Sequence, residues 1–198
     1  MQIKGRTMAH HDQRYFFGYG SLVNRNTHQY DNPRPAQLSG WRRVWRHTVL
    51  RPLAYLTVEP DSSTTIDGLI AAVPDADWDA LDVRETAYER VPAAHQVQHP
   101  LPFQPEIALY SIPDGKHGRP TERHPVLLSY IDVVVQGYLH EYGAKGATLF
   151  FDTTDGWDAP ILNDRAKPVY PRHCKLSRGE TDFVDDALSR LSAQVKQL

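Results

Sequence analysis

The chain has 198 residues and a formal net charge of -2. A chain of this length buries a substantial core and is expected to fold as one domain, and its near-neutral charge does not indicate a nucleic-acid partner. No stretch approaches the roughly 20 apolar residues of a membrane span. The single cysteine, Cys174, excludes an intrachain disulfide and fits a reducing, cytoplasmic location. The oligomeric state is not readable from these features.

The N-terminal residues are polar and lack the apolar core of a signal peptide. We expect residues 1–14 to form a flexible lead-in and residues 15–198 to form a single domain. At the start of this domain, three consecutive aromatic residues predict a short buried strand over residues 15–20.

A glycine-punctuated turn follows this strand. Gly18 and Gly20 flank Tyr19, so the backbone there can adopt a positive φ or approach a ligand closely. If the chain turns immediately afterwards, the amides of Gly20, Ser21 and Leu22 become unpaired donors that suit an anion. The glycines alone favour a simple tight turn after a core strand.

Strands dominate the first half of the expected fold. Apolar runs predict them at residues 38–49, 53–58, 67–73, 88–97 and 106–110, with turn residues at 50–52 and 61–63 between the first three. The segment Trp41-Arg42-Arg43-Val44-Trp45-Arg46-His47 alternates like a strand. It favours Trp41 and either Val44 or Trp45 facing inward and the arginines outward, rather than a patch that binds single-stranded nucleic acid.

Helices dominate the second half. A short early helix is expected after Asp75 as N-cap, with Trp78, Leu81 and Val83 on its buried side. Longer patterns predict a helix from His124-Pro125 to Gly143, a short one over residues 144–151, and a last one that opens with a capping box at residues 177–180. The polar stretch 112–125 is expected to be a surface loop. Strands first and helices later indicate an α+β fold, with a sheet or small barrel that carries helices on its outside.

A second chemical motif lies where the short helix ends and a strand begins. The segment Leu81-Asp82-Val83-Arg84-Glu85-Thr86-Ala87-Tyr88-Glu89-Arg90 places a carboxylate near the negative end of a helix dipole. We therefore expect Glu85 to have a raised pKa suited to a general base. A salt-bridged surface role for Glu85 is the competing interpretation.

Together, the Tyr19-Gly20-Ser21-Leu22 turn and the segment around Glu85 resemble the γ-glutamylcyclotransferase-like family, at least over residues 15–97. The resemblance implies a mixed β-barrel with peripheral helices and a C-terminal helix. It gives Glu85 the role of general acid/base, the turn that of substrate-binding loop, and Tyr88 a place along the site.

The activity implied by this resemblance is cyclisation of a small γ-glutamyl amide. The substrate's own α-amine attacks its side-chain carbonyl and releases 5-oxoproline and an amine or amino acid. Because the nucleophile is intramolecular, no cofactor or metal is expected. The leaving amine is not specified, and the residues after the turn, 23–28, differ from those of the glutathione-specific branch, which puts glutathione in doubt.

Two other functions remain open, a non-catalytic small-molecule binder and a protein-interaction module on the same fold. Several further residues also have two interpretations. Arg25 and His28 are candidates for recognising a carboxylate, and loop 112–123 is a candidate lid. The pair Asp164-Arg165 is expected to be a structural ion pair or part of the pocket rim. Tyr130 is expected to belong to the core.

Overall fold

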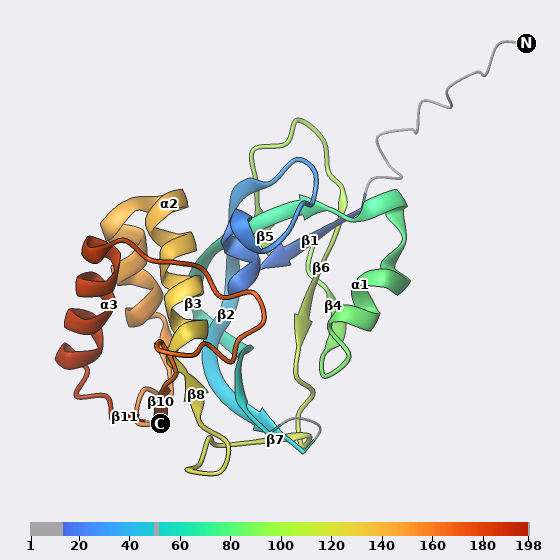
Figure 1. Ribbon diagram of the computed structural model, residues 1–198. Coiled ribbons are helices and arrows are strands. Elements are labelled where there is room, and N and C mark those ends of the chain that lie inside the picture. Colours follow the sequence, from blue (N-terminus) through green and yellow to red (C-terminus); the bar gives the residue numbers. More distant parts are fainter. Residues whose placement is uncertain (1–13, 50–51, 198) are drawn as a thin grey trace, which may run out of the picture.

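The computed structural model describes residues 14–49 and 52–197 (Figure 1). Except for Arg14, which opens the first strand, the expected lead-in lies outside the described residues, as do residues 50 and 51 of an expected turn. The fold is α+β, as predicted, with a curled mixed sheet and helices packed outside it. In the described residues, no helix is both long and apolar enough to cross a membrane.

Eight strands form the main sheet, in the order β4-β6-β1-β3-β2-β5, with β7 and β9 also paired to β2. Their bounds are β1 Arg14–Gly18, β2 Arg34–Thr48, β3 Ala54–Ala72, β4 Glu89–Pro92, β5 Val97–Gln98, β6 Glu106–Ser111, β7 His117–Gly118 and β9 Thr154–Asp155. Strand β1 lies between an antiparallel neighbour, β3, and a parallel one, β6, so the sheet is mixed. A small parallel sheet combines β8 Val126–Leu127, β10 Ile161–Asn163 and β11 Val195–Gln197.

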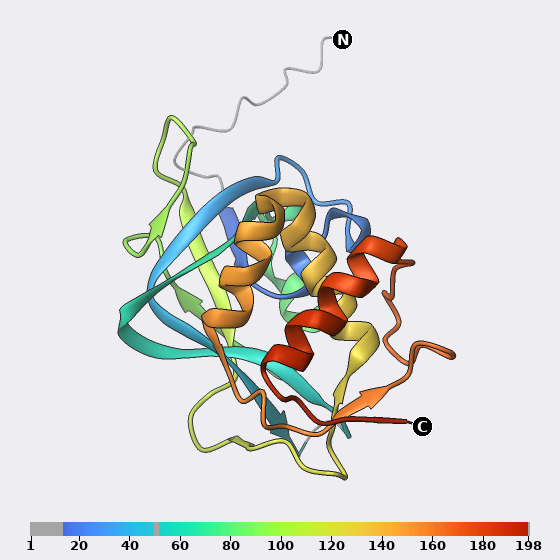
Figure 2. The ribbon, with the colours of Figure 1, turned by 90° about the vertical axis from the view of Figure 1, so that its left-hand side faces the viewer.

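Helices cover both faces of the main sheet. Helices α2 Leu128–Asp152 and α3 Arg178–Arg190 lie on one side, and α1 Trp78–Arg84 lies on the other (Figures 1 and 2). The aromatic run of β1 serves both layers because alternate side chains point to opposite faces. Tyr15 and Phe17 join the large core under α2, whereas Phe16 joins a smaller cluster with Trp78 and Leu81.

One long strand, β3, replaces two of the expected strands. The sequence predicted separate strands at residues 53–58 and 67–73, but β3 runs without a break from Ala54 to Ala72. The turn-like residues after Pro60 form an irregularity inside this strand instead, opposite Gly40, which has a φ of 85°. Asp61 stabilises this bend by accepting hydrogen bonds from Ser63 and Thr64.

The short helix starts two residues later than predicted. Asp77, not Asp75, is the N-cap of α1, and its carboxylate accepts a hydrogen bond from the backbone N–H of Asp79. Asp75 instead lies in the preceding 3-10 turn, η4 Pro74–Ala76, with a φ of 52°. Trp78 and Leu81 are buried as predicted, but Val83 faces solvent.

The long helix α2 also differs at its start. His124-Pro125 does not open it, because Val126 and Leu127 pair with β10 and the helix begins at Leu128. Gly143 interrupts it with a φ of 68°, which matches the predicted end of one helix and start of another. The capping box of Ser177 and Glu180 at the start of α3 is present as predicted.

Candidate functional site

The turn after β1 and the end of α1 meet at one small pocket, a cavity of about 50 Å³ that opens to solvent. All six candidate site residues from the sequence lie along it. The complete lining is Phe17, Gly18, Tyr19, Gly20, Ser21, Leu22, Leu56, Glu85, Tyr88, Tyr110 and Tyr130. Among the described residues, the candidate lid 112–123 adds nothing to this lining.

The turn itself consists of two short 3-10 segments, η2 Ser21–Val23 and η3 Arg25–Thr27. Its glycines serve close packing and not a positive φ, since Gly20 has a φ of -115°. A β-carbon on Gly18 would lie 2.5 Å from the Leu22 β-carbon, and one on Gly20 would lie 2.8 Å from the Tyr130 hydroxyl. The backbone therefore passes directly against its neighbours at the pocket wall.

Glu85 is the C-cap of α1, and its backbone N–H donates to Leu81 O. Its carboxylate Oε1 lies 3.1 Å from Nε of Arg84, and both side chains are largely buried. The negative charge of Glu85 reaches into the pocket. The pKa values of Tyr19 and Tyr130 are raised first of all by burial, and the Glu85 carboxylate raises both further.

Tyrosines form most of the remaining wall. Tyr19 donates a hydrogen bond of 2.5 Å to the carbonyl of Tyr110, and Tyr88 donates one of 2.9 Å to the carbonyl of Leu56. The hydroxyl of Tyr110 donates to Asp82. Burial and the Asp82 carboxylate raise the pKa of Tyr110, so this phenol stays protonated at neutral pH.

Tyr130 is the wall residue that the sequence assigned to the core alone. It is buried, and its ring makes edge contacts with Trp45, Tyr55 and Tyr170, with a centroid distance of 4.9 Å to Tyr170. Its hydroxyl faces the backbone of the turn at Gly20 and Ser21. Tyr110 and Leu56 were also missed, and no local motif distinguishes them from ordinary strand residues.

Other candidates from the sequence lie elsewhere. Arg25 forms an ion pair with Glu141 at 2.5 Å, and the His28 ring lies 3.0 Å from the carbonyl of Leu22. Neither residue lines the pocket.

The expected ion pair between Asp164 and Arg165 is wrong: the two side chains bind different partners, and neither lines the pocket. Asp164 is fully buried and accepts hydrogen bonds from the backbone N–H and the hydroxyl of Ser129 and from Val169 N–H. Arg165 pairs with Asp132 and Asp185, each at 2.7 Å.

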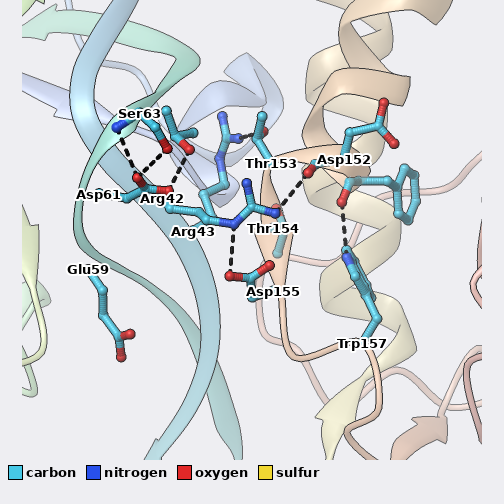
Figure 3. Close-up of polar contacts among 12 residues, drawn as sticks. Arg42, Arg43, Glu59, Asp61, Ser63, Asp152, Thr153, Thr154, Asp155 and Trp157 are labelled. Carbon is cyan, nitrogen blue, oxygen red and sulfur yellow. Dashed lines mark hydrogen bonds and ion pairs between the residues drawn. The ribbon is translucent and has the colours of Figure 1, made fainter.

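Arg43 contradicts the expectation that the arginines of β2 face solvent. Its side chain is buried, whereas the side chain of the neighbouring Arg42 is partly exposed and pairs with Asp155 at 2.8 Å (Figure 3). Val44 and Trp45, which follow it, are buried as well, so three consecutive residues of β2 lie inside. The error was to assume that charge keeps an arginine outside.

The pocket thus combines one carboxylate with the backbone of a tight turn and a ring of phenols. A carboxylate can accept and return a proton, and backbone N–H groups can hold an anion or a developing negative charge. Among residues 14–49 and 52–197, no three His, Cys, Asp or Glu side chains gather in a way that would hold a metal ion.

Comparison with known proteins shows that the segment forming this pocket matches a family model. A family model described as gamma-glutamyl cyclotransferase, AIG2-like, matches residues 16–141, which include every residue of the pocket lining. No curated protein sequence matches the chain.

Solved structures share the fold at low sequence identity. YkqA from Bacillus subtilis has a TM-score of 0.51 and 17% identity, over 73% of this chain and 56% of its own, so this chain spans little more than half of YkqA. A structure described as gamma-glutamyl cyclotransferase has a TM-score of 0.52 and 12% identity, over 88% of this chain and 99% of its own. The uncharacterized protein loc79017 from Homo sapiens has a TM-score of 0.53 and 11% identity, over 88% of this chain and 99% of its own. At these identities the similarity concerns the fold.

Proposed function

The chain belongs to the gamma-glutamyl cyclotransferase, AIG2-like family, and we propose that it is a cyclotransferase that converts a small γ-glutamyl amide into 5-oxoproline and a free amine or amino acid. The observation that carries this proposal is the meeting of Glu85 with the turn 19–22 in one pocket, although more than sixty residues separate them in sequence. The family match covers both segments.

The reaction needs little from the protein besides orientation and proton transfer. In a γ-glutamyl amide, the α-amine nitrogen and the side-chain carbonyl carbon become members of one five-membered ring, so holding the substrate in a folded shape supplies much of the rate. The α-ammonium must lose a proton before it attacks the side-chain carbonyl. The leaving nitrogen must gain a proton when the C–N bond breaks.

Glu85 is the group we assign to both proton transfers. Among the described residues it is the one carboxylate of the pocket lining, and its Oε1 lies 3.1 Å from Arg84 Nε. The protonated carboxyl then returns this proton to the departing amine. The ring nitrogen loses its second proton as the lactam forms, and the released amine takes up a proton to become an ammonium ion. Tyr88 lines the pocket beside Glu85.

The turn is the part we assign to substrate binding. Its backbone N–H groups at Gly20 and Leu22 are suited to the substrate α-carboxylate or to the oxyanion formed on attack, whereas the N–H of Ser21 meets the Tyr130 hydroxyl. An oxyanion donor of this kind typically contributes about 3 kcal/mol to transition-state stabilisation.

A mass-spectrometric screen for 5-oxoproline tests this proposal. The purified protein is incubated with glutathione, γ-glutamyl dipeptides and γ-glutamylamines, and product is measured against a blank without protein. Formation of 5-oxoproline with any panel member supports the proposal and identifies the leaving group. A protein that binds a panel member, as shown by a thermal shift, and yet forms no 5-oxoproline is a binder on this fold, which is the alternative.

A further inference from the structure

Arg43 is a charged side chain buried without a carboxylate partner among the described residues. Its residue is 1% exposed, and every acceptor around its guanidinium is neutral. The rings of Tyr138 and Phe150 lie 4.9 and 5.3 Å from its central carbon, which adds cation–π attraction. Burying an uncompensated charge is costly, so a position of this kind indicates a function for the charge.

The guanidinium lies directly behind the turn of the pocket. Arg43 Nε donates a hydrogen bond of 3.2 Å to the backbone carbonyl of Tyr19, and the Tyr138 hydroxyl lies 3.0 Å from the same oxygen. On its far side, Nη1 donates to Thr153 Oγ1 at 2.8 Å, just beyond the end of α2 (Figure 3). Arg43 therefore joins β2 and α2 to the first peptide unit of the turn.

Charged side chains are sparse along the pocket in the part of the chain that the structure describes. The lining within the described chain has one carboxylate, Glu85, and no lysine, arginine or histidine. For a substrate with a carboxylate, the one charge along the described part of the lining is repulsive. The charge of Arg43 does act on this space, as the pKa of Tyr19 shows. Burial raises this pKa most and the Glu85 carboxylate raises it further, whereas the Arg43 guanidinium lowers it.

We propose that Arg43 is the positive element of this site: from behind the turn it makes the pocket selective for a ligand that carries a carboxylate. This inference rests on the proposed function, since it concerns the α-carboxylate of a γ-glutamyl substrate. Arg43 is a positioning residue, because it acts through the Tyr19–Gly20 peptide and does not line the pocket.

Two effects act together. The first is the Coulomb attraction of a buried charge that water screens poorly. The second is polarisation of the peptide. The carbonyl of Tyr19 and the N–H of Gly20 belong to one amide, so a charged donor on its oxygen strengthens the N–H as a donor. Both effects favour an anion over a neutral ligand of the same shape.

The test compares two ligands that differ only in this charge, L-5-oxoproline and its carboxamide, L-5-oxoprolinamide, by calorimetric titration. The first variant, Thr153→Asp, places a carboxylate against Arg43 Nη1 and neutralises the guanidinium without removing it. Its matched control, Thr153→Asn, has the same shape and no charge. A second pair is Arg43→Met and Arg42→Met, which each remove one positive charge from adjacent positions of β2.

In wild type we expect the carboxylate to bind roughly tenfold more tightly than the carboxamide, as for a hydrogen-bonded ionic interaction. Thr153→Asp and Arg43→Met should bring this ratio close to one, whereas Thr153→Asn and Arg42→Met should keep it. A merely structural role would weaken both ligands equally and leave the ratio unchanged, which overturns the inference. If Arg43→Met does not fold, the Thr153 pair decides.

The binding ratio also separates this inference from the proposed function. A wild-type protein that shows the ratio and loses it in Thr153→Asp, yet forms no 5-oxoproline, supports the role of Arg43 and contradicts the cyclotransferase. A protein that forms 5-oxoproline but keeps its ratio in Thr153→Asp contradicts the role of Arg43 alone. Absence of binding by both ligands to wild type overturns the role of Arg43.

Discussion

The hydroxyl of Tyr130 occupies the space that a side chain on residue 20 would need. A β-carbon built on Gly20 would lie 2.8 Å from this oxygen, and real β-carbons essentially never come within 3.0 Å of such an atom. Tyr130 has little freedom to move away, because Trp45 and Tyr170 pack against the edges of its ring. Helix α2 and the turn therefore fix one another at the pocket wall.

Replacing Gly20 with alanine should separate the turn from Tyr130. We expect Gly20→Ala to lower kcat/KM by on the order of 100-fold, since displacements near 1 Å in a reacting geometry have effects of this size. The measurement is the rate of 5-oxoproline release.

The control for this substitution is Gly179→Ala in α3, where an added β-carbon meets nothing within 4 Å. It should leave turnover unchanged and add less than about 1 kcal/mol of stability, because alanine is favoured over glycine in a helix and Gly179 lies only in its first turn. Equal turnover in the two variants would contradict the steric role of Gly20.

Asp164 should be important for stability. Its buried carboxylate accepts the backbone N–H of Ser129 at 2.8 Å, in the first turn of α2, where the N-cap Leu127 provides no side-chain acceptor. We expect Asp164→Asn to reduce the free energy of unfolding by about 3 kcal/mol, because an amide cannot accept from all the donors around it. Urea unfolding measures this loss.

Asp185→Asn is the comparison for Asp164, because Asp185 forms an exposed ion pair with Arg165. Its loss should cost less than about 1 kcal/mol. Similar losses in the two variants would show that Asp164 does not hold the start of α2.

The capping box of α3 should make the free energy of unfolding depend on pH in the acidic range. Burial opposes the charged form of Glu180, but hydrogen bonds from Ser177, Gln136 and His140 outweigh it, and the pKa of Glu180 lies below its ordinary 4.5. The unfolded chain then binds more protons than the folded one near this pH, so the carboxylate stabilises the fold above the ordinary pKa. This contribution disappears as the pH falls through the lower pKa of the folded state.

Glu180→Gln tests that dependence, since glutamine keeps the size of the side chain. Wild type should be more stable than the variant by about 1 kcal/mol at pH 7, as expected for a charged group at a helix N-terminus. The difference should decline toward zero in titrations that continue well below pH 4.5. A difference that stays constant with pH would show that the charge of Glu180 contributes nothing.

The parts of the site that local sequence reveals are those that carry a motif. The turn at Tyr19 and the carboxylate at Glu85 were both predicted, and both line the same pocket. Short-range patterns also gave the capping box at Ser177 and the interruption at Gly143, because a cap or a helix break involves only neighbouring residues.

The residues that sequence missed depend on contacts between distant segments. Arg43 is buried because its acceptors come from Tyr19, Asp67, Tyr138 and Thr153, which no window around residue 43 contains. Tyr130 follows the same helical period as its core neighbours, and periodicity does not reveal that its hydroxyl reaches a pocket. Strand β3 was divided in two because Asp61 and its neighbours have turn chemistry, which here makes a bend inside a strand.

The most direct test of the account is the turnover of Glu85→Gln on the best γ-glutamyl substrate from the screen, measured as 5-oxoproline formed per enzyme. Glutamine keeps the shape of the side chain but cannot carry the proton, so we predict a loss of about 10²–10⁴-fold. Glu89→Gln, at an exposed carboxylate paired with Lys116, should retain wild-type turnover. Full turnover by Glu85→Gln would contradict the assignment of Glu85 as the group that transfers the proton.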